Sequence, residues 1–171
     1  MDDSDVWGED DGRGREGVER EDARPAFCRK FAERTLARFG IVEPPVPVDR
    51  LASKLGLLVR IVDLPRGVDA RLRVRGDERI IELATGQARV RQRFSLAHEL
   101  GHHLLGHRHG ESDVAERQAN IFAGALLVPP AWLRRDVASG MTAEELSTRY
   151  DVSREVMFIA VQDARLLKKL R

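Results

Sequence analysis

The stretch that decides the fold is FSLAHELGHHLL, residues 94–105, in which two histidines stand four residues apart and a glutamate follows the first. Residues i and i+4 of an α-helix project from one face, about 6 Å apart along the axis. His98 and His102 can therefore bind one Zn²⁺ ion through their imidazoles, while Glu99 lies beside the ion as a general base. The surrounding apolar residues have the spacing of a buried helix face, so we expect a helix from about 87 to 107.

A catalytic zinc site needs a third protein ligand and one open position. The next expected helix begins near the segment AERQAN, which carries Glu116 on its first turn and Asn120 four residues later. If the two helices pair antiparallel through the short loop between them, Glu116 completes a two-histidine, one-glutamate site. Asn120 can then accept a hydrogen bond from the second nitrogen of a ligand imidazole. The alternative is an ordinary helix whose polar residues bind no metal.

The remaining polar candidates are weaker. His103 points about 100° away from the ligand pair, since successive helical residues differ by that angle. His107 falls on the wrong side for the same ion, and His109 falls in the loop. We interpret these three as solvated surface residues, although a peptidase also needs a donor for its oxyanion. One of the three, or Tyr150, the only tyrosine, is a candidate for that donor.

Charge and composition set the broad class. Residues 1–24 hold ten acids and four arginines, whereas the whole chain has a net charge of +1. So polar a segment buries too little apolar surface to offset its ordering entropy, which predicts a disordered acidic tail. Cys28 is the only cysteine, and we expect it to be a small buried hydrophobe. No apolar run is long enough to cross a membrane, and the start lacks a secretory signal, so we expect a cytoplasmic protein.

The pattern of apolar residues predicts an α+β fold that is mainly helical. The segment LLVRIVDL and a hairpin over 71–83 predict a small three-stranded antiparallel sheet, in which RIIEL forms the edge strand for an extended substrate. We expect a zincin-like metallopeptidase domain over 25–140 and a C-terminal helical segment over 141–171 packed on it.

The C-terminal segment has the outline of a helix-turn-helix, with DVS at the turn. A helix that reads DNA presents polar side chains to the base edges. Here Arg154 and Glu155 are followed by Met157, Phe158 and Ile159, which is typical of a packing helix. We therefore expect packing or contact with a repressor, and DNA binding is the weaker alternative.

Four stretches resemble the ImmA/IrrE family of metallopeptidases, in the order of that family: VDRLASKLGLLVRIVDLP, ERIIEL, RQRFSLAHELGHHLLGH and ERQANIFAGALLVPPAWL. The resemblance implies that His98, His102 and Glu116 bind zinc and that Glu99 is the general base. One departure is the end of the strand before the zinc helix, where many members have Asn and this chain continues with Leu83.

The resemblance also implies a function. Family members are small cytoplasmic bacterial proteins that cleave helix-turn-helix repressors and so relieve repression of a mobile-element or stress-response locus. Some are regulators that keep only the peptidase-like fold. A non-proteolytic regulator that binds a repressor or DNA is therefore the alternative to a zinc metalloendopeptidase.

Overall fold

The computed structural model describes residues 24–107 and 112–170. The predicted disordered tail over 1–24 lies outside these residues, apart from Arg24. Within the described ranges, no helix is both long enough and apolar enough to cross a membrane. Cys28 is fully buried on the first described helix, as expected, and burial raises the pKa of its thiol.

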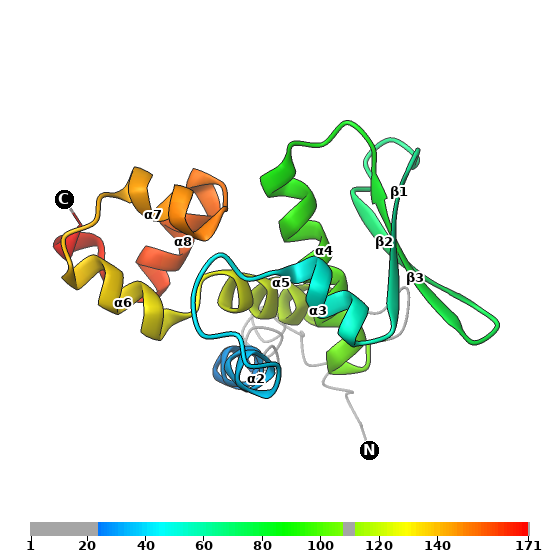
Figure 1. Cartoon of the computed structure of the whole chain (residues 1–171), viewed down its shortest axis with the longest axis horizontal. Helices are drawn as coiled ribbons and strands as arrows, with labels where there is room; N and C mark the ends of the chain where they lie inside the picture. Colours follow the sequence, from blue (N-terminus) through cyan, green and yellow to red (C-terminus); the bar gives the residue numbers. More distant parts are fainter. Residues whose placement is uncertain (1–23, 108–111, 171) are drawn as a thin grey trace, which may run out of the picture.

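Seven α-helices, three strands and one short 3₁₀ helix make up the described part of the chain, and the α+β, mainly helical class is confirmed (Figure 1). In chain order they are α2 (Pro25–Arg38), α3 (Val48–Lys54), β1 (Leu57–Val62), β2 (Ala70–Arg75), β3 (Glu78–Ala84), α4 (Arg89–Leu105), α5 (Asp113–Leu127), α6 (Pro130–Ala138), α7 (Ala143–Tyr150), α8 (Arg154–Asp163) and η1 (Leu167–Lys169).

The sheet has the order β1-β3-β2, with β2 antiparallel and β1 parallel to β3. The prediction of an all-antiparallel sheet is therefore wrong for the β1–β3 pair. Residues 63–77 are long enough to form the crossover that a parallel pair needs. The prediction that RIIEL is the edge strand is also wrong. Its residues Ile80 and Ile81 are buried, so this apolar strand takes the centre, and the arginine-rich β2 becomes an edge.

Helix α5 runs through the middle of the molecule, with α4 and the sheet on one side, α2 on the other, and α6 to α8 at one end (Figure 1). One hydrophobic core joins these parts, because Leu100 of α4 and Phe122 of α5 belong to the same buried cluster as Leu146 of α7 and Met157 of α8. The expected division into a domain over 25–140 and a segment over 141–171 stays a prediction.

Two buried polar residues, Arg93 and Asp136, hold the C-terminal segment against the rest of the fold. The Arg93 guanidinium on α4 donates to the backbone oxygens of Val46 and Asp151, both at 3.0 Å. The Tyr150 hydroxyl donates to the Asp136 carboxylate at 2.9 Å. Burial alone would raise the pKa of Asp136, but hydrogen bonds from Arg135, Tyr150 and Arg149 outweigh it and hold the pKa below its ordinary value.

Replacing Asp136 by Asn should lower the free energy of unfolding by about 1.5–3 kcal/mol, because a buried charged acceptor of three donors is lost. The folded pKa of Asp136 lies below the unfolded one, so its contribution is present above about pH 4 and is lost at lower pH. Urea titrations of both proteins should therefore show a difference at pH 7 that shrinks as the pH falls below about 4. Asp163→Asn, which removes a half-exposed partner of Arg29, should change stability by less than about 1 kcal/mol. A pH-independent difference for Asp136→Asn contradicts this account.

Candidate metal centre

Helices α4 and α5 run antiparallel, as the paired contacts along them show. His98 contacts Asn120, while His102, one turn further along α4, contacts Glu116, one turn earlier on α5. Helix α4 forms here because its residues Leu96, Ala97 and Leu100 are buried on one side. That packing leaves the two histidines half-buried at the rim of a cleft, facing the first turn of α5.

The structure brings His98, His102 and Glu116 together. The two Nε2 atoms are 2.9 Å apart, and the Glu116 carboxylate oxygens lie 3.3 Å from His98 Nε2 and 3.2 Å from His102 Nε2. Two ligands at about 2.1 Å from a tetrahedral zinc ion are separated by about 3.4 Å. Both the donor set and its spacing therefore fit one zinc ion. Among the described residues this is the one such group of three histidine, cysteine or acidic side chains.

One hydrogen bond on the far side of His98 determines which ring nitrogen carries the proton. Its Nδ1 lies 2.9 Å from the Asn120 Oδ1 atom, in agreement with the expected role of Asn120. An amide oxygen accepts hydrogen bonds and donates none, so Nδ1 carries the proton and Nε2 keeps a lone pair. That lone pair points toward the neighbouring ligand atoms, which is the tautomer that a metal ion requires.

A chain of two hydrogen bonds determines the tautomer of His102 in the same way. The Gln118 Oε1 atom lies 2.8 Å from His107 Nε2, which therefore donates the proton of that contact. His107 Nδ1 is then an acceptor, and it lies 3.1 Å from His102 Nδ1, which must donate. His102 Nε2 consequently keeps its lone pair for the metal.

The interpretation of His107 as a solvated surface residue is therefore wrong. Gly106 adopts φ 75°, a left-handed conformation that ends α4 and turns the chain back over the last turn. This reversal places the His107 side chain against His102, a position that it would not reach if α4 continued as a helix. The glycine just after the apolar pattern is the sequence signal that could have indicated the reversal.

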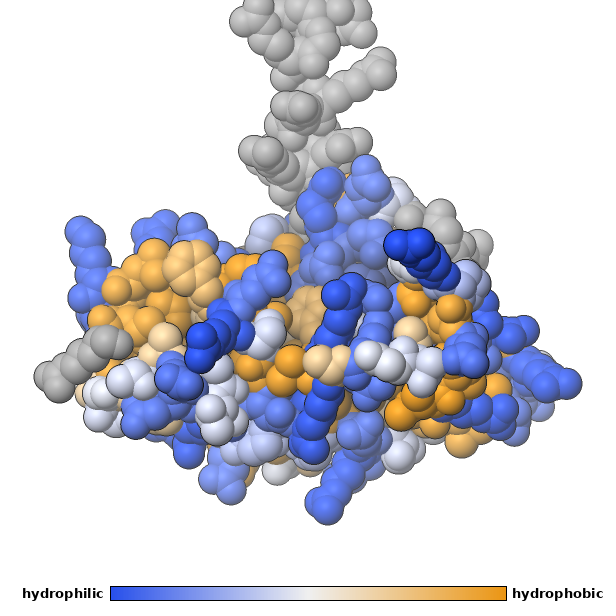
Figure 2. Space-filling model, turned by 90° about the horizontal axis from the view of Figure 1, so that it is seen from above, coloured by the Kyte–Doolittle hydropathy of each residue, from blue (hydrophilic) through white to orange (hydrophobic). Residues whose placement is uncertain are grey.

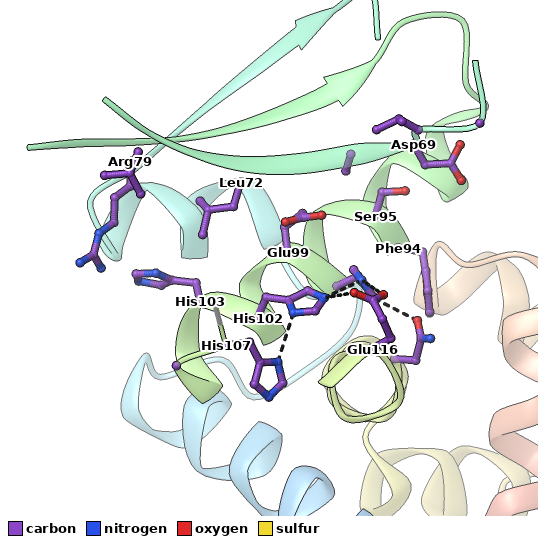
Figure 3. A pocket seen from close by; sticks show the side chains of 17 residues that line it. Asp69, Leu72, Arg79, Phe94, Ser95, Glu99, His102, His103, His107 and Glu116 are labelled. Carbon is purple, nitrogen blue, oxygen red and sulfur yellow. Dashed lines mark hydrogen bonds and ion pairs between the residues drawn. The ribbon is translucent and has the colours of Figure 1, made fainter. Parts of the chain in front are cut away.

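Glu99 lies on the wall of the same cleft, between the ligand group and β2, and is only 7% exposed (Figure 3). Burial, followed by the nearby charge of Glu116, raises the pKa of Glu99 to about 7, while the backbone N–H of Leu72 donates to the carboxylate and opposes the increase. A carboxylate that titrates near neutral pH is suited to both accepting and returning a proton.

The cleft has a volume of about 780 Å³ and lies between α4 and the edge strand β2. Ala70, Leu72 and Val74 line one wall, because alternate residues of a strand share a face. The backbone groups of the same three residues point away from β3. The Asp69 carbonyl accepts from Ala84 N–H in the ladder at 2.9 Å, so the even-numbered residues face the open edge.

The structure places the other candidate donors to the oxyanion in different environments. His103 lines the cleft, and its pKa is lowered by burial and by the charge of Arg79. Tyr150 is fully buried and its hydroxyl is bonded to Asp136, so it is structural and is not a donor for an oxyanion in this cleft. His109 lies outside the described residues.

The approach of α4 to α5 depends on Gly101, which lies between His98 and His102 in sequence. A Cβ atom at this position would be 3.2 Å from both Cα and the carbonyl oxygen of Ala119, and 3.1 Å from Cδ1 of Phe122. These separations are shorter than ordinary carbon contacts. The small residues Gly101 and Ala119 thus let the two helices lie close enough for Glu116 to reach the histidines.

Gly101→Val should lower the free energy of unfolding by about 1–3 kcal/mol and weaken zinc binding, because the added methyl groups force the helices apart. The matched control is Gly124→Ala on α5, where a Cβ would meet no atom within 4 Å. That change should be neutral or stabilising by up to about 1 kcal/mol. Urea denaturation and competition with a zinc-binding dye measure the two effects. Equal behaviour of the two variants argues against a spacing role for Gly101.

His107→Ala should weaken zinc binding by about 10- to 100-fold, since it releases the Nδ1 proton of His102 from its acceptor. His103→Ala provides the comparison, because His103 is adjacent to His102 but lines the cleft on another side. Its zinc affinity should stay within about threefold of the parent. Titration with a chromophoric chelator checks both, and the same loss in the two variants means that His107 has no specific effect.

The fold and the site together define a metallopeptidase-like protein. The sequence model of the IrrE N-terminal-like domain family, a peptidase family, matches residues 52–160, so this chain belongs to that family and the ImmA/IrrE resemblance is confirmed. A Mycobacterium tuberculosis transcriptional regulator of known structure is similar, with a TM-score of 0.60 and 20% identity over 84% of this chain and 49% of that one. The chain thus spans about half of that regulator, and the likeness shows a shared fold. No curated protein matches.

Proposed function

We propose that this protein is a zinc-dependent metalloendopeptidase that cleaves a transcriptional repressor. One observation carries the proposal, namely that three suitable ligand atoms converge beside a buried glutamate and an open strand edge. In this proposal His98, His102 and Glu116 hold the zinc ion. Glu99 is the general base.

Bound zinc supplies a Lewis acid, which polarises a peptide carbonyl and lowers the pKa of a water molecule. Glu99 takes up the proton of the attacking water and returns it to the amine that leaves. The Leu72 N–H holds the carboxylate at the strand edge, and Asn120 and His107 keep the two imidazoles in the required tautomer. Each of these steps uses an atom that already faces the cleft.

The substrate enters as an extended chain. The outward backbone groups of Ala70 and Val74, together with the Leu72 carbonyl, form a row that can pair with one more strand. Only a segment without its own secondary structure can pair in this way. The site therefore favours a loop, a linker or a locally unfolded part of a protein.

His103 is the proposed donor to the oxyanion. It lies in the cleft opposite Leu72, with Arg79 nearby (Figure 3). Because its pKa is lowered, its imidazole is neutral at pH 7 and still has one N–H to donate.

A helix-turn-helix repressor in the cytoplasm is the proposed substrate, and its cleavage would switch on a mobile-element or stress-response locus. Two findings support this choice: membership of the IrrE N-terminal-like family and the likeness to a protein described as a transcriptional regulator. The second candidate is a regulator that binds a repressor without cutting it. The exposed apolar residues Phe158 and Ile159 on α8, 57% and 50% exposed, favour a protein contact there over DNA.

Glu99→Gln distinguishes the two candidates. It should retain zinc, because the ligand set is intact, and should slow cleavage by about 10²- to 10⁴-fold, because the general base is lost. Cleavage of a purified helix-turn-helix repressor, followed on gels, measures the rate, and bound zinc is measured by metal analysis. Regulation that survives Glu99→Gln unchanged supports the binding function and rules out proteolysis as its cause.

A further inference from the structure

A second cavity of about 810 Å³ adjoins the metal cleft and lies between α5 and α8. The two cavities share four lining residues, Asp69, Phe94, Ser95 and Asn120. Phe94 lies on the side of the cleft that faces the C-terminal helices (Figure 3). The second cavity therefore lies directly beside the metal cleft, and it extends from these four residues toward α8.

The second cavity, which we call the α5–α8 groove, has mainly apolar walls. Ile121 and Val128 come from α5 and the residue after it, and Val156 and Ile159 come from α8. Ile159 is 50% exposed although it is a large aliphatic residue. Figure 2 shows hydrophobic side chains gathered over the C-terminal helices at the left, apart from those over the sheet at the right. An apolar surface next to a polar reaction site is typical of a subsite for an apolar side chain.

Charges at the rim of the groove are largely paired within the protein. Arg29 forms an ion pair with Asp163 at 3.0 Å, and the Arg91 guanidinium binds the Asp69 carboxylate through two nitrogens. Glu155 and Arg134 add one further charge of each sign to the same rim, so the rim carries no cluster of cations. A nucleic acid would need unpaired cations here, so this rim favours an uncharged segment of polypeptide.

The direction of β2 indicates which part of the substrate reaches the groove. At the start of β2, the Asp69 carboxylate is bound by Arg91, which is on the first turn of α4. At the other end of β2, Val74 pairs with Arg79, and Arg79 lies near His103, toward the end of α4. Strand β2 therefore runs in the same direction as α4. A chain that pairs antiparallel to β2, the more stable arrangement, runs the opposite way and leaves the cleft beside Phe94.

We propose that the α5–α8 groove binds a large apolar side chain of the substrate on the C-terminal side of the cleaved bond. The inference rests on the proposed peptidase function for the identity of the bound chain. It gives helix α8 a role as one wall of a substrate site, and it makes the enzyme selective for a polypeptide segment with an apolar residue after the cleaved bond.

The groove can be filled without touching the metal ligands. Gly124 lines the groove, and a Cβ there would meet no atom within 4 Å, so the side chain introduced by Gly124→Phe can start from the helix without a clash and partly fill the groove. Ile159→Ser removes an apolar contact from the wall. Phe158→Ser is the matched control, because Phe158 is equally exposed on α8 but does not line the groove.

The test uses the full chain with Glu99→Gln and zinc, panned against a library of random linear displayed peptides. The recovered peptides should carry a large apolar residue, and they should bind Gly124→Phe and Ile159→Ser about tenfold more weakly, as expected for loss of one buried aliphatic contact. Their affinity for Phe158→Ser should be unchanged. Recovery of no peptide that Gly124→Phe weakens overturns the proposal.

The same peptides are then incubated with the protein that retains Glu99, and the products are identified by mass spectrometry. Cleavage on the N-terminal side of the apolar residue is the expected result, and cleavage on its C-terminal side overturns the proposed direction. If the peptides bind through the groove but remain intact, the groove assignment holds while the proposed peptidase function fails.

Discussion

The close packing of α4 against α5 is the constraint on which the site depends. Glu116 and the two histidines belong to different helices, so the distance between the helix axes decides whether three ligand atoms can surround one ion. Gly101 and Ala119 set that distance by bringing backbone against backbone. A helix pair separated by ordinary side chains would leave the carboxylate out of range, whatever its sequence spacing.

Proton placement is the second requirement, and it is met by residues that bind no metal. The two Nε2 atoms and the Glu116 carboxylate lie within about 3 Å of one another and direct only lone pairs toward the space between them. These lone pairs repel one another, and a cation bound between them removes the repulsion. Asn120 accepts a hydrogen bond from His98 Nδ1, and His107, held by Gln118, accepts one from His102 Nδ1. These acceptors keep the protons on the outer nitrogen of each ring. The ligand geometry and the hydrogen bonds behind it thus form one unit.

Local periodicity explains why much of the fold, and the convergence of His98, His102 and Glu116, could be predicted. The spacing of His98 and His102 is fixed by the helix itself, and a short loop after α4 favours an antiparallel α5, which places Glu116 opposite them. The order of the strands could not be predicted in this way, because the alternation of apolar and polar residues in β1 does not determine which strand β1 pairs with. The return of His107 over α4 depends on one left-handed residue, and the α5–α8 groove depends on contacts between residues far apart in the chain.

Arg93 has a consequence for how this protein can change during evolution. Its guanidinium joins α4 to the loop before α3 and to the turn between α7 and α8, and it stands next to Phe94 at the junction of the two cavities. The C-terminal helices therefore cannot be exchanged as an independent cassette without disturbing the helix that carries His98. Under the proposed role of the α5–α8 groove, changes in substrate preference should arise by point substitutions on the face of α8 that lines the groove, with the backbone of the C-terminal helices preserved.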